Sequence, residues 1–291
     1  MWFFWRHRGE AALGRLQSKT MSHGETTTLP SQASREILIE MRDVAKVYNA
    51  ADGVSVRAVD SVSGQIRAGE FVAILGPSGC GKSTLMMMAA GLLSTTEGEI
   101  TFRGNRVTEP LRDFGVVFQD AVLLPWRSVR ENVELPGEIA GVSRQQRADK
   151  AMEMLRLVGL SGFENKFPHE LSGGMQQRVA IARALSLNPS LLLMDEPFGA
   201  LDAMTRETMN LELQRISQQS GATVIFVTHS IAEAAFLANR VFVMSGRPST
   251  VREVVTIDIP RPRAIELLSS DRLGAYITRL RKLLDVTGDA S

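Results

Sequence analysis

The chain has 291 residues, of which 44% are hydrophobic, so it is long enough to bury a core in one or two domains. Its 33 Lys and Arg residues nearly balance its 32 Asp and Glu residues, which disfavours a protein that binds nucleic acid by neutralising phosphates. A single cysteine excludes an intrachain disulfide and favours a reducing compartment.

The first segment, up to about Ser34, is rich in Ser, Thr, Gly and Gln and has neither a helical nor a strand period. This composition predicts a flexible leader over residues 1–34, with Met21 as an alternative start. The opening cluster Trp2–Trp5 is too short and wrongly ordered for a secretory signal. No apolar run approaches the ~20 residues that a membrane-spanning helix needs, so a membrane role is expected only through a partner.

The predicted core begins with strands. Ile37–Val44 alternates apolar and polar residues, as a half-buried strand does, whereas Phe71–Leu75 is the continuous apolar run of a buried central strand. Lys82–Ala90 is helix-like and stops at Gly91, a suitable helix C-terminus. Glu99–Arg103, bracketed by turn glycines, predicts another short strand.

The chain from Gln119 to Leu187 changes to a helical pattern, which predicts a helical subdomain over about residues 120–187. Ser128 and Ser143 each begin a capping-box pattern, so a helix is expected to start at each of them. The second of these helices is expected to stop near Gly159.

Strands and helices then alternate again. Leu191–Asp195 and Thr223–Thr228 predict buried strands, each followed by a helix, and the second helix opens with a capping box from Ser230 to Glu233. The remaining expected elements are strands Arg240–Met244 and Val251–Ile259 and a closing helix Ala264–Leu284. The pattern predicts an α/β protein with its main domain over residues 35–262 and a helical tail over residues 263–291.

Residues 76–84 carry the clearest chemical motif. They fit G-x-x-x-x-G-K-[ST] between a strand and a helix, where glycines let backbone N–H groups surround phosphates and the helix adds its positive end. Lys82 is expected to reach the outer phosphates, and Ser83 to give a hydroxyl to Mg²⁺. The expected nucleotide-binding residues here are Gly76, Pro77, Ser78, Gly79, Cys80, Gly81, Lys82, Ser83 and Thr84.

Two further motifs extend this prediction. The strand Leu191–Asp195 runs into two carboxylates, of which Asp195 is expected to hold Mg²⁺ and Glu196 to polarise the attacking water. Ser172 and two glycines precede a helix and form a second anion-binding helix start. A simple helix cap by Ser172 would not explain why a second phosphate cradle occurs in one chain.

Ser172-Gly-Gly-Met-Gln-Gln resembles the signature motif of ABC-type ATPases, and the other motifs of that family are present in its order. The resemblance covers about Ile37–Pro260 and implies a P-loop NTPase of ABC type, with a mixed sheet core, an antiparallel β region and the helical subdomain. The roles that it implies are adenine stacking for Tyr48, contact with Mg²⁺ or the water for Gln119, a loop crossing between subunits for Asp202, γ-phosphate contact for His229, and cover over ATP of a second copy for Ser172, Gly173, Gly174 and Gln176.

Leu123–Val133 and Val254–Arg263 resemble the importer ATPases for nitrate, sulfonates and taurine. This resemblance implies an ATP- and Mg²⁺-dependent homodimer that drives uptake through integral membrane permease subunits, peripheral on the cytoplasmic face of the inner membrane. A periplasmic or extracytoplasmic solute-binding protein would act indirectly. Alternatively, Leu123–Trp126 is only a packed turn at the start of a helix. In such systems the solute does not contact this subunit, so the sequence does not encode its binding pocket.

Two rival functions are weighed against import. A non-transport ABC ATPase acting on ribosomes or DNA usually fuses two cassettes or carries zinc modules, whereas this sequence has a single cassette and no Cys cluster. A non-hydrolysing nucleotide-binding scaffold would lack Glu196 or His229, and both are present. ATP hydrolysis, with Lys82, Gln119, Glu196 and His229 as its catalytic residues, is therefore the favoured reading.

Overall fold

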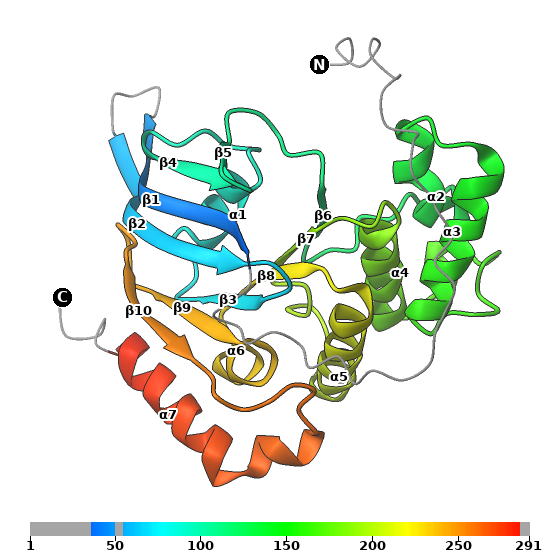
Figure 1. Ribbon diagram of the computed structural model, residues 1–291. Coiled ribbons are helices and arrows are strands. Elements are labelled where there is room, and N and C mark those ends of the chain that lie inside the picture. The colour runs from blue at the N-terminus through cyan, green and yellow to red at the C-terminus, as the bar shows by residue number, and fades with distance from the viewer. Residues whose placement is uncertain (1–35, 50–54, 286–291) are drawn as a thin grey trace, which may run out of the picture. The chain divides into compact units, whose positions relative to one another are not determined.

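The computed structural model describes residues 36–49 and 55–285 (Figure 1), so the predicted leader and Met21 lie outside the described residues. Its strands are β1 (Ile37–Asn49), β2 (Ser55–Arg67), β3 (Phe71–Leu75), β4 (Glu97–Phe102), β5 (Asn105–Arg106), β6 (Phe114–Val117), β7 (Leu191–Asp195), β8 (Thr223–Thr228), β9 (Arg240–Met244) and β10 (Val251–Thr256). Its helices are α1 (Lys82–Ala89), α2 (Val129–Ile139), α3 (Arg144–Leu157), α4 (Gly173–Leu185), α5 (Ala203–Ser220), α6 (Ile231–Leu237) and α7 (Asp271–Asp285), with 3₁₀ turns η2 (Pro168–Glu170) and η3 (Ile265–Ser269).

The strands form two sheets. The six-stranded sheet has the order β10-β9-β3-β8-β7-β6, and its strands run parallel except for β10, which pairs antiparallel with β9 at one edge. The four-stranded sheet, ordered β2-β1-β4-β5, is antiparallel throughout. The predicted mixed core with an antiparallel β region is thus confirmed.

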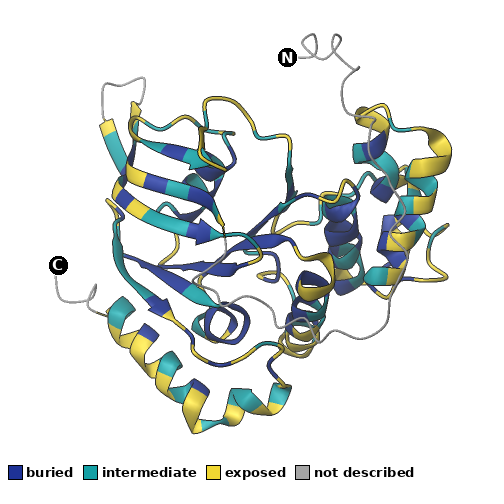
Figure 2. Ribbon diagram, in the orientation of Figure 1, coloured by how far each residue is buried: buried dark blue, intermediate teal, exposed yellow. Residues whose placement is uncertain are grey.

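The central strand β3 is buried on both faces, which explains its continuous apolar sequence. Phe71, Ala73 and Leu75 belong to a hydrophobic cluster that includes residues of α4 to α7. Val72 and Ile74 point to the opposite face, into a cluster that includes residues of α1 and of the antiparallel sheet. In Figure 2 the buried strands of the six-stranded sheet are coloured dark blue, between the helices that pack on one face and the antiparallel sheet and α1 on the other.

The antiparallel sheet differs from the prediction in two respects. β1 continues to Asn49 rather than ending near Val44, because register shifts between Met41 and Val44 and beyond break the strict alternation. Its partner β2 was not predicted, since the strand is mixed in polarity and only partly buried. The extension matters for the site because it carries Tyr48, which pairs with Val56.

The helical region between β6 and β7 contains α2, α3 and α4, all inside the predicted limits of the helical subdomain, which themselves stay a prediction. The predicted capping box at Ser128 is present: Ser128 Oγ accepts from Glu131 N at 3.3 Å, and Glu131 Oε2 accepts from Ser128 N at 2.8 Å. Ser143 likewise accepts from Gln146 N. In residues 36–49 and 55–285, no helix combines the length and apolarity that crossing a membrane requires.

The predicted closing helix Ala264–Leu284 is wrong as a single element. The chain makes the 3₁₀ turn η3 and then an extended residue, Ser270 (ψ 143°), whose hydroxyl accepts from Leu273 N at 3.3 Å and starts α7. β10 also ends at Thr256, before the predicted Ile259. The backbone has left the sheet there, since the Ile259 carbonyl accepts from the guanidinium of Arg263 at 2.8 Å.

Arg263 itself is 1% exposed. Its Nη1 donates to the carbonyls of Ala235, Phe236 and Ala238 at 2.8 to 2.9 Å. Ala235 and Phe236 belong to the last turn of α6 and Ala238 is its C-cap, where carbonyls have no partner within the helix. Burial lowers the pKa of Arg263 to about 10, and the side chain stays charged at neutral pH. The segment after β10 therefore supplies hydrogen-bond donors to the C-terminal end of α6.

Candidate active site

The loop between β3 and α1 has the backbone that its glycines predict. Gly81 lies at φ 110°, immediately before the first residue of α1. A Cβ at Gly81 would lie 2.9 Å from Ala58 O, and a Cβ at Gly76 would lie 2.9 Å from Cys80 Sγ. The loop is thus wrapped too closely for side chains at these positions. No side chain in the described part of the chain caps the N-terminus of α1, so its N–H groups are suited to bind anionic phosphates.

Lys82 projects back across this loop. Its ammonium is almost fully buried and donates to the carbonyls of Gly76 and Pro77, each at 3.0 Å. It also lies 3.5 Å from Glu196 Oε1, beyond the end of β7. A cation is therefore held where the phosphate loop meets the acidic strand end.

The carboxyl end of β7 supplies two acids, as predicted. Ser83 Oγ donates to Asp195 Oδ1 at 2.9 Å, so the hydroxyl and carboxylate expected to share a magnesium ion already adjoin. Burial raises the pKa of Asp195, while the Ser83 hydrogen bond and the charge of Lys82 oppose that rise. These oxygens, with the Gln119 amide, are of the kind that Mg²⁺ prefers.

Glu196 occupies the left-handed region, with φ 45°. Its N–H donates to Val227 O at 2.9 Å, which ties this conformation to β8. Glu196 Oε2 lies 2.8 Å from Nδ1 of His229, the residue directly after β8. Such a conformation is uncommon for a residue other than glycine and is typical of functional sites, where surrounding contacts hold it.

β3, β8 and β7 are adjacent and parallel, so their carboxyl ends lie at one edge of the sheet. The phosphate loop follows β3, His229 follows β8, and Glu196 follows β7. This is the edge at which open α/β sheets bind ligands. The sequence motifs that lie furthest apart along the chain are thus brought together by strand order.

Two predicted residues border this site. Tyr48 is 42% exposed, and its hydroxyl lies 3.3 Å from Thr84 Oγ1 on α1. Gln119 is exposed after β6, and a Cβ at Gly199 would fall 3.1 Å from its Nε2. The backbone at Phe118 is held by α4, because Gln177 Nε2 donates to its carbonyl at 2.8 Å. The segment that carries Gln119 is thereby connected to α4, the helix that follows Ser172.

Ser172 begins α4, with Oγ accepting from Met175 N at 3.4 Å. Gly174 packs tightly, since a Cβ there would lie 2.8 Å from Thr205 Cγ2 on α5. Among the described residues, no hydrogen bond or ion pair joins residues 172–174 to residues 76–84. The signature and the phosphate loop of one chain are therefore not in polar contact.

Two further predicted residues make contacts within their own chain. Gln176 Nε2 donates to Pro168 O at 2.9 Å and to Leu171 O at 3.3 Å, so its amide supports the turn before α4. Asp202 starts α5, where its carboxylate accepts from the backbone and hydroxyl of Thr205 at 3.0 and 2.6 Å. The Thr205 hydrogen bonds lower the pKa of Asp202.

Sequence reasoning missed Arg247, whose Nη2 donates to Gly79 O at 2.6 Å. No motif could have indicated it, because Arg247 lies 168 positions from Gly79 and reaches it only through the turn between β9 and β10. Cys80, next to Gly79, is buried, and its burial raises the pKa of the thiol. This environment agrees with its interpretation as a small neutral spacer.

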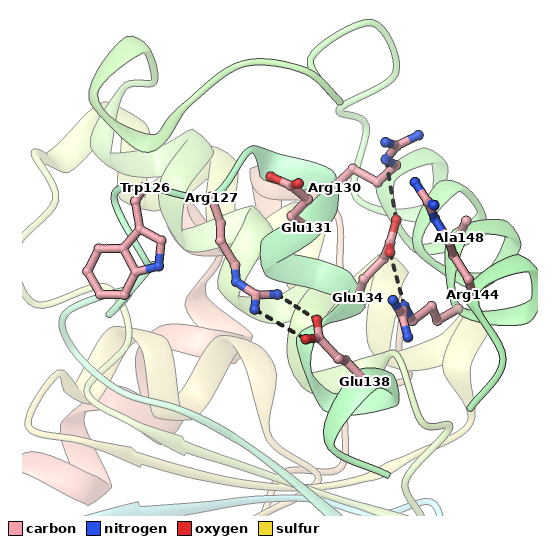
Figure 3. A pocket seen from close by; sticks show the side chains of 9 residues that line it. Trp126, Arg127, Arg130, Glu131, Glu134, Glu138, Arg144 and Ala148 are labelled. Atoms are coloured by element: carbon pink, nitrogen blue, oxygen red, sulfur yellow. Dashed lines mark hydrogen bonds and ion pairs between the residues drawn. The ribbon is translucent and has the colours of Figure 1, made fainter. Parts of the chain in front are cut away.

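A cavity of about 460 Å³ lies apart from these residues, on α2 and α3 (Figure 3). Trp126 at its rim is 71% exposed, and Arg127 pairs with Glu138 at 2.7 Å. Glu134 lies between Arg130 and Arg147, at 3.3 and 3.4 Å from them. The cavity combines an exposed indole with partly compensated charges.

A family model described as ABC transporter matches residues 59–199. The taurine import ATP-binding protein TauB of Rhizobium johnstonii is 53% identical over 220 residues, covering 75% of this chain and 84% of that protein. The nitrate import ATP-binding protein NrtD of Synechocystis sp. is 47% identical, covering 76% and 83%. The aliphatic sulfonates import ATP-binding protein SsuB of Bacillus cereus is 43% identical, covering 78% and 88%.

Solved structures of ABC transporter cassettes are also similar to this chain. A dimeric ATP-binding cassette in a post-hydrolysis state, bound to ADP and Pi, matches with a TM-score of 0.65 and 33% identity over 77% of this chain and 100% of that chain. The chain cbiO1 of Clostridium perfringens, part of an ABC transporter complex, matches with a TM-score of 0.68 and 26% identity over 84% and 96%. With the phosphate loop, acidic strand end and histidine at one sheet edge, the chain belongs to the ABC transporter family as one of its ATP-binding ATPase subunits.

Proposed function

We propose that the chain powers import of a small solute of the taurine, sulfonate or nitrate class, by hydrolysing ATP next to a separate membrane permease. The observation that carries the ATPase chemistry is the convergence of Lys82, Glu196 and His229 at one edge of the sheet. The solute class is supported by the names of the relatives, all three of which are import ATP-binding proteins.

In the proposed reaction, water attacks the γ-phosphorus of ATP and the bond to the β-phosphate oxygen breaks, giving ADP and phosphate. Glu196 orients and polarises that water, and His229, 2.8 Å from Glu196, contacts the transferred phosphoryl group. Lys82 balances negative charge on the outer phosphate oxygens. Tyr48 stacks on the adenine.

Ser83, Asp195 and Gln119 are the proposed magnesium ligands, supported by the 2.9 Å contact between Ser83 Oγ and Asp195 Oδ1. Bound Mg²⁺ would neutralise charge on the β- and γ-phosphates. Burial raises the pKa of Asp195. A bound divalent cation would lower it again, because the cation favours the ionised carboxylate.

Two copies are proposed to pack head to tail, with Ser172, Gly173 and Gly174 of each covering ATP on the phosphate loop of the other. Support comes from the dimeric cassettes among the similar structures and from the lack of polar contact between the two motifs within the described chain. Gln176 and Asp202 border the same interface in this arrangement. Opening and closing of the pair would then be coupled to transport.

The proposed contact for the permease is the helical region of α2 and α3, near Gln119. Its cavity of about 460 Å³ and the exposed Trp126 offer an apolar anchor surrounded by charges, which suits a protein interface. The subunit would then lie peripherally on the cytoplasmic face of the membrane. A solute-binding protein would deliver the solute on the other side.

The test is a Glu196→Gln variant. Loss of the general base is expected to lower kcat for ATP at least ~100-fold while ATP still binds, whereas Glu207→Gln, an exposed carboxylate on α5, retains wild-type kcat. In the source organism with the gene deleted, the wild-type gene is expected to restore uptake of radiolabelled taurine, an alkanesulfonate or nitrate. Restoration of uptake by the Glu196→Gln gene would contradict the proposal.

A further inference from the structure

Arg206, near the start of α5, holds the loop that leads into its own helix. Its Nη2 donates to Leu201 O at 2.8 Å and its Nε to Phe198 O at 3.3 Å. One guanidinium therefore contacts two carbonyls of the loop from residue 198 to Asp202. Asp202, at its end, is exposed and is the residue proposed to meet the second copy.

Glu233, on α6, performs a similar task for the turn that presents His229. Its Oε2 accepts from Thr228 Oγ1 at 2.7 Å, and that same hydroxyl oxygen accepts from Ser230 N at 2.9 Å. The residues before and after His229 are thus tied to a single hydroxyl, whose direction Glu233 sets. His229 is in this way aimed at Glu196, 2.8 Å away.

These contacts explain why the capping box predicted for Ser230 and Glu233 is only half formed. Ser230 Oγ accepts from Glu233 N, as a cap should, but the Glu233 carboxylate does not return to the Ser230 N–H. It accepts from Thr228 instead. The Glu233 carboxylate thus stabilises the turn that carries His229 rather than the N-terminus of α6.

The two arrangements meet at one carboxylate. Glu233 Oε1 lies 3.7 Å from Arg206 Nε, while its other oxygen accepts from Thr228. Glu233 is 7% exposed, and a buried carboxylate is costly unless a cation accompanies it. Burial raises the pKa of this group, and the hydrogen bond from Thr228 and the charge of Arg206 oppose the rise. Movement of the Asp202 loop that displaced Arg206 would therefore change the electrostatics of the His229 turn.

We propose that Arg206 and Glu233 are positioning residues that couple the loop ending at Asp202 to the catalytic pair Glu196 and His229. Contact of a second copy with Asp202 would, through this ion pair, set the orientation of His229. The inference rests on the two-copy arrangement proposed above. It assigns a function to two residues that are not among the proposed nucleotide-binding residues.

The diagnostic variant is Glu233→Gln, because an amide oxygen can still accept from Thr228 but carries no charge for Arg206. We expect kcat for ATP to fall at least about fivefold while KM stays within about twofold, since the phosphate loop and Tyr48 are unchanged and only the placement of His229 is affected. Arg206→Gln should give the same split, and Arg206→Lys, which keeps the charge, should recover part of kcat.

The coupling is measured by a double-mutant cycle between Glu233→Gln and Asp202→Asn. If the ion pair transmits the effect of Asp202, the loss of kcat in the double variant is clearly smaller than the product of the single losses. Fold losses that simply multiply would overturn the inference. So would an unchanged kcat in Glu233→Gln.

Glu70→Gln is the matched control, because Glu70 is also buried and paired, with Arg240 at 3.3 Å. It precedes β3, at the opposite strand end from the phosphate loop. It is expected to lower Tm without lowering kcat. If the wild type does not hydrolyse ATP and the Glu196→Gln protein does not dimerise with ATP, the proposed function fails. If both are observed but the fold losses of the double-mutant cycle simply multiply, only the coupling fails.

Discussion

The phenol of Tyr48 lies at the rim of the site, with its hydroxyl 3.3 Å from Thr84 Oγ1. If its ring stacks on adenine, Tyr48→Ala should weaken ATP binding about fivefold or more, because stacking of a base on an aromatic ring contributes ~1–3 kcal/mol. Tyr48→Phe keeps the ring and should bind as the wild type does. Titration with a fluorescent ATP analogue measures both. Equal affinity of the Ala and Phe variants would refute the stacking role.

Burial of Glu233 predicts the sign of a pH dependence of the stability of the fold. Burial raises the pKa of its carboxyl above 4.5, so the folded state binds this proton more tightly than the unfolded state does. The contribution of Glu233 to the free energy of unfolding therefore falls as pH rises upward from 4.5 through the folded-state pKa.

Glu233→Gln removes that titration. In urea denaturation, the stability of the variant relative to the wild type should increase between about pH 5 and about pH 8. A relative stability that is the same at both pH values, or that moves in the opposite direction, would contradict the raised pKa.

Individual site residues were predictable when their motif stated both chemistry and neighbours. Lys82, Ser83 and Asp195 followed from the phosphate loop and the acidic strand end, and the structure brings them within hydrogen-bond or ion-pair distance of their partners. Arg247 and Arg206 were not predictable. Their functions depend on backbone carbonyls of folded loops, and a carbonyl has no sequence signature.

Among the elements, β6 and α4 pack with no space between them at Gly115. A Cβ there would lie 2.3 Å from the carbonyl oxygen of Ala184, a backbone atom that cannot simply rotate away. Gly115→Ala should lower the free energy of unfolding by about 1–3 kcal/mol. Urea denaturation checks it, and an unchanged midpoint would mean that the two elements are less closely packed than described.

Gly274 provides the opposite case. It lies within α7, and no atom of the described residues, beyond its chain neighbours and its own helix backbone, comes within 4 Å of a Cβ built there. Gly274→Ala should raise the free energy of unfolding by about 0.5–1 kcal/mol, because alanine has the higher helix propensity. Urea denaturation checks this too, and an unchanged or lower midpoint for Gly274→Ala would contradict the expected gain in helix propensity.

Elements with a single strong pattern were predicted well, and those held by distant contacts were not. The apolar runs of β3, β7 and β8 are confirmed, as is the capping box of α2. β2 and the break at Ser270 were missed. β2 takes its pairing from β1, and the stretch ahead of Ser270 is tied to the body of the chain by Arg263, whose backbone N–H donates to Gln214 at 2.8 Å.

For the whole molecule, the proposed site is completed by a second copy. Ser172→Arg would place a bulky cation where the signature of one copy faces ATP on the other. ATP-dependent dimerisation of the Glu196→Gln protein should be lost on this substitution, and kcat of the otherwise wild-type protein should fall about tenfold or more. Analytical ultracentrifugation with and without ATP measures the first effect.

Binding of ATP to single copies should survive Ser172→Arg, since residues 172–174 have no polar contact with their own phosphate loop. That result separates an interface defect from a folding defect. A dimer that still forms with ATP would contradict the head-to-tail arrangement.

The order of strands also governs how the chain matures on the ribosome. β3, which leads into the phosphate loop, lies between β8 and β9, yet both neighbours are synthesised much later. A nascent chain that ends before residue 223 therefore exposes both edges of an apolar strand, the kind of surface that chaperones protect from aggregation. The proposed nucleotide site includes Glu196 after β7 and His229 after β8, so it is complete only when β8 has emerged. From that point bound nucleotide would stabilise the folded chain by mass action.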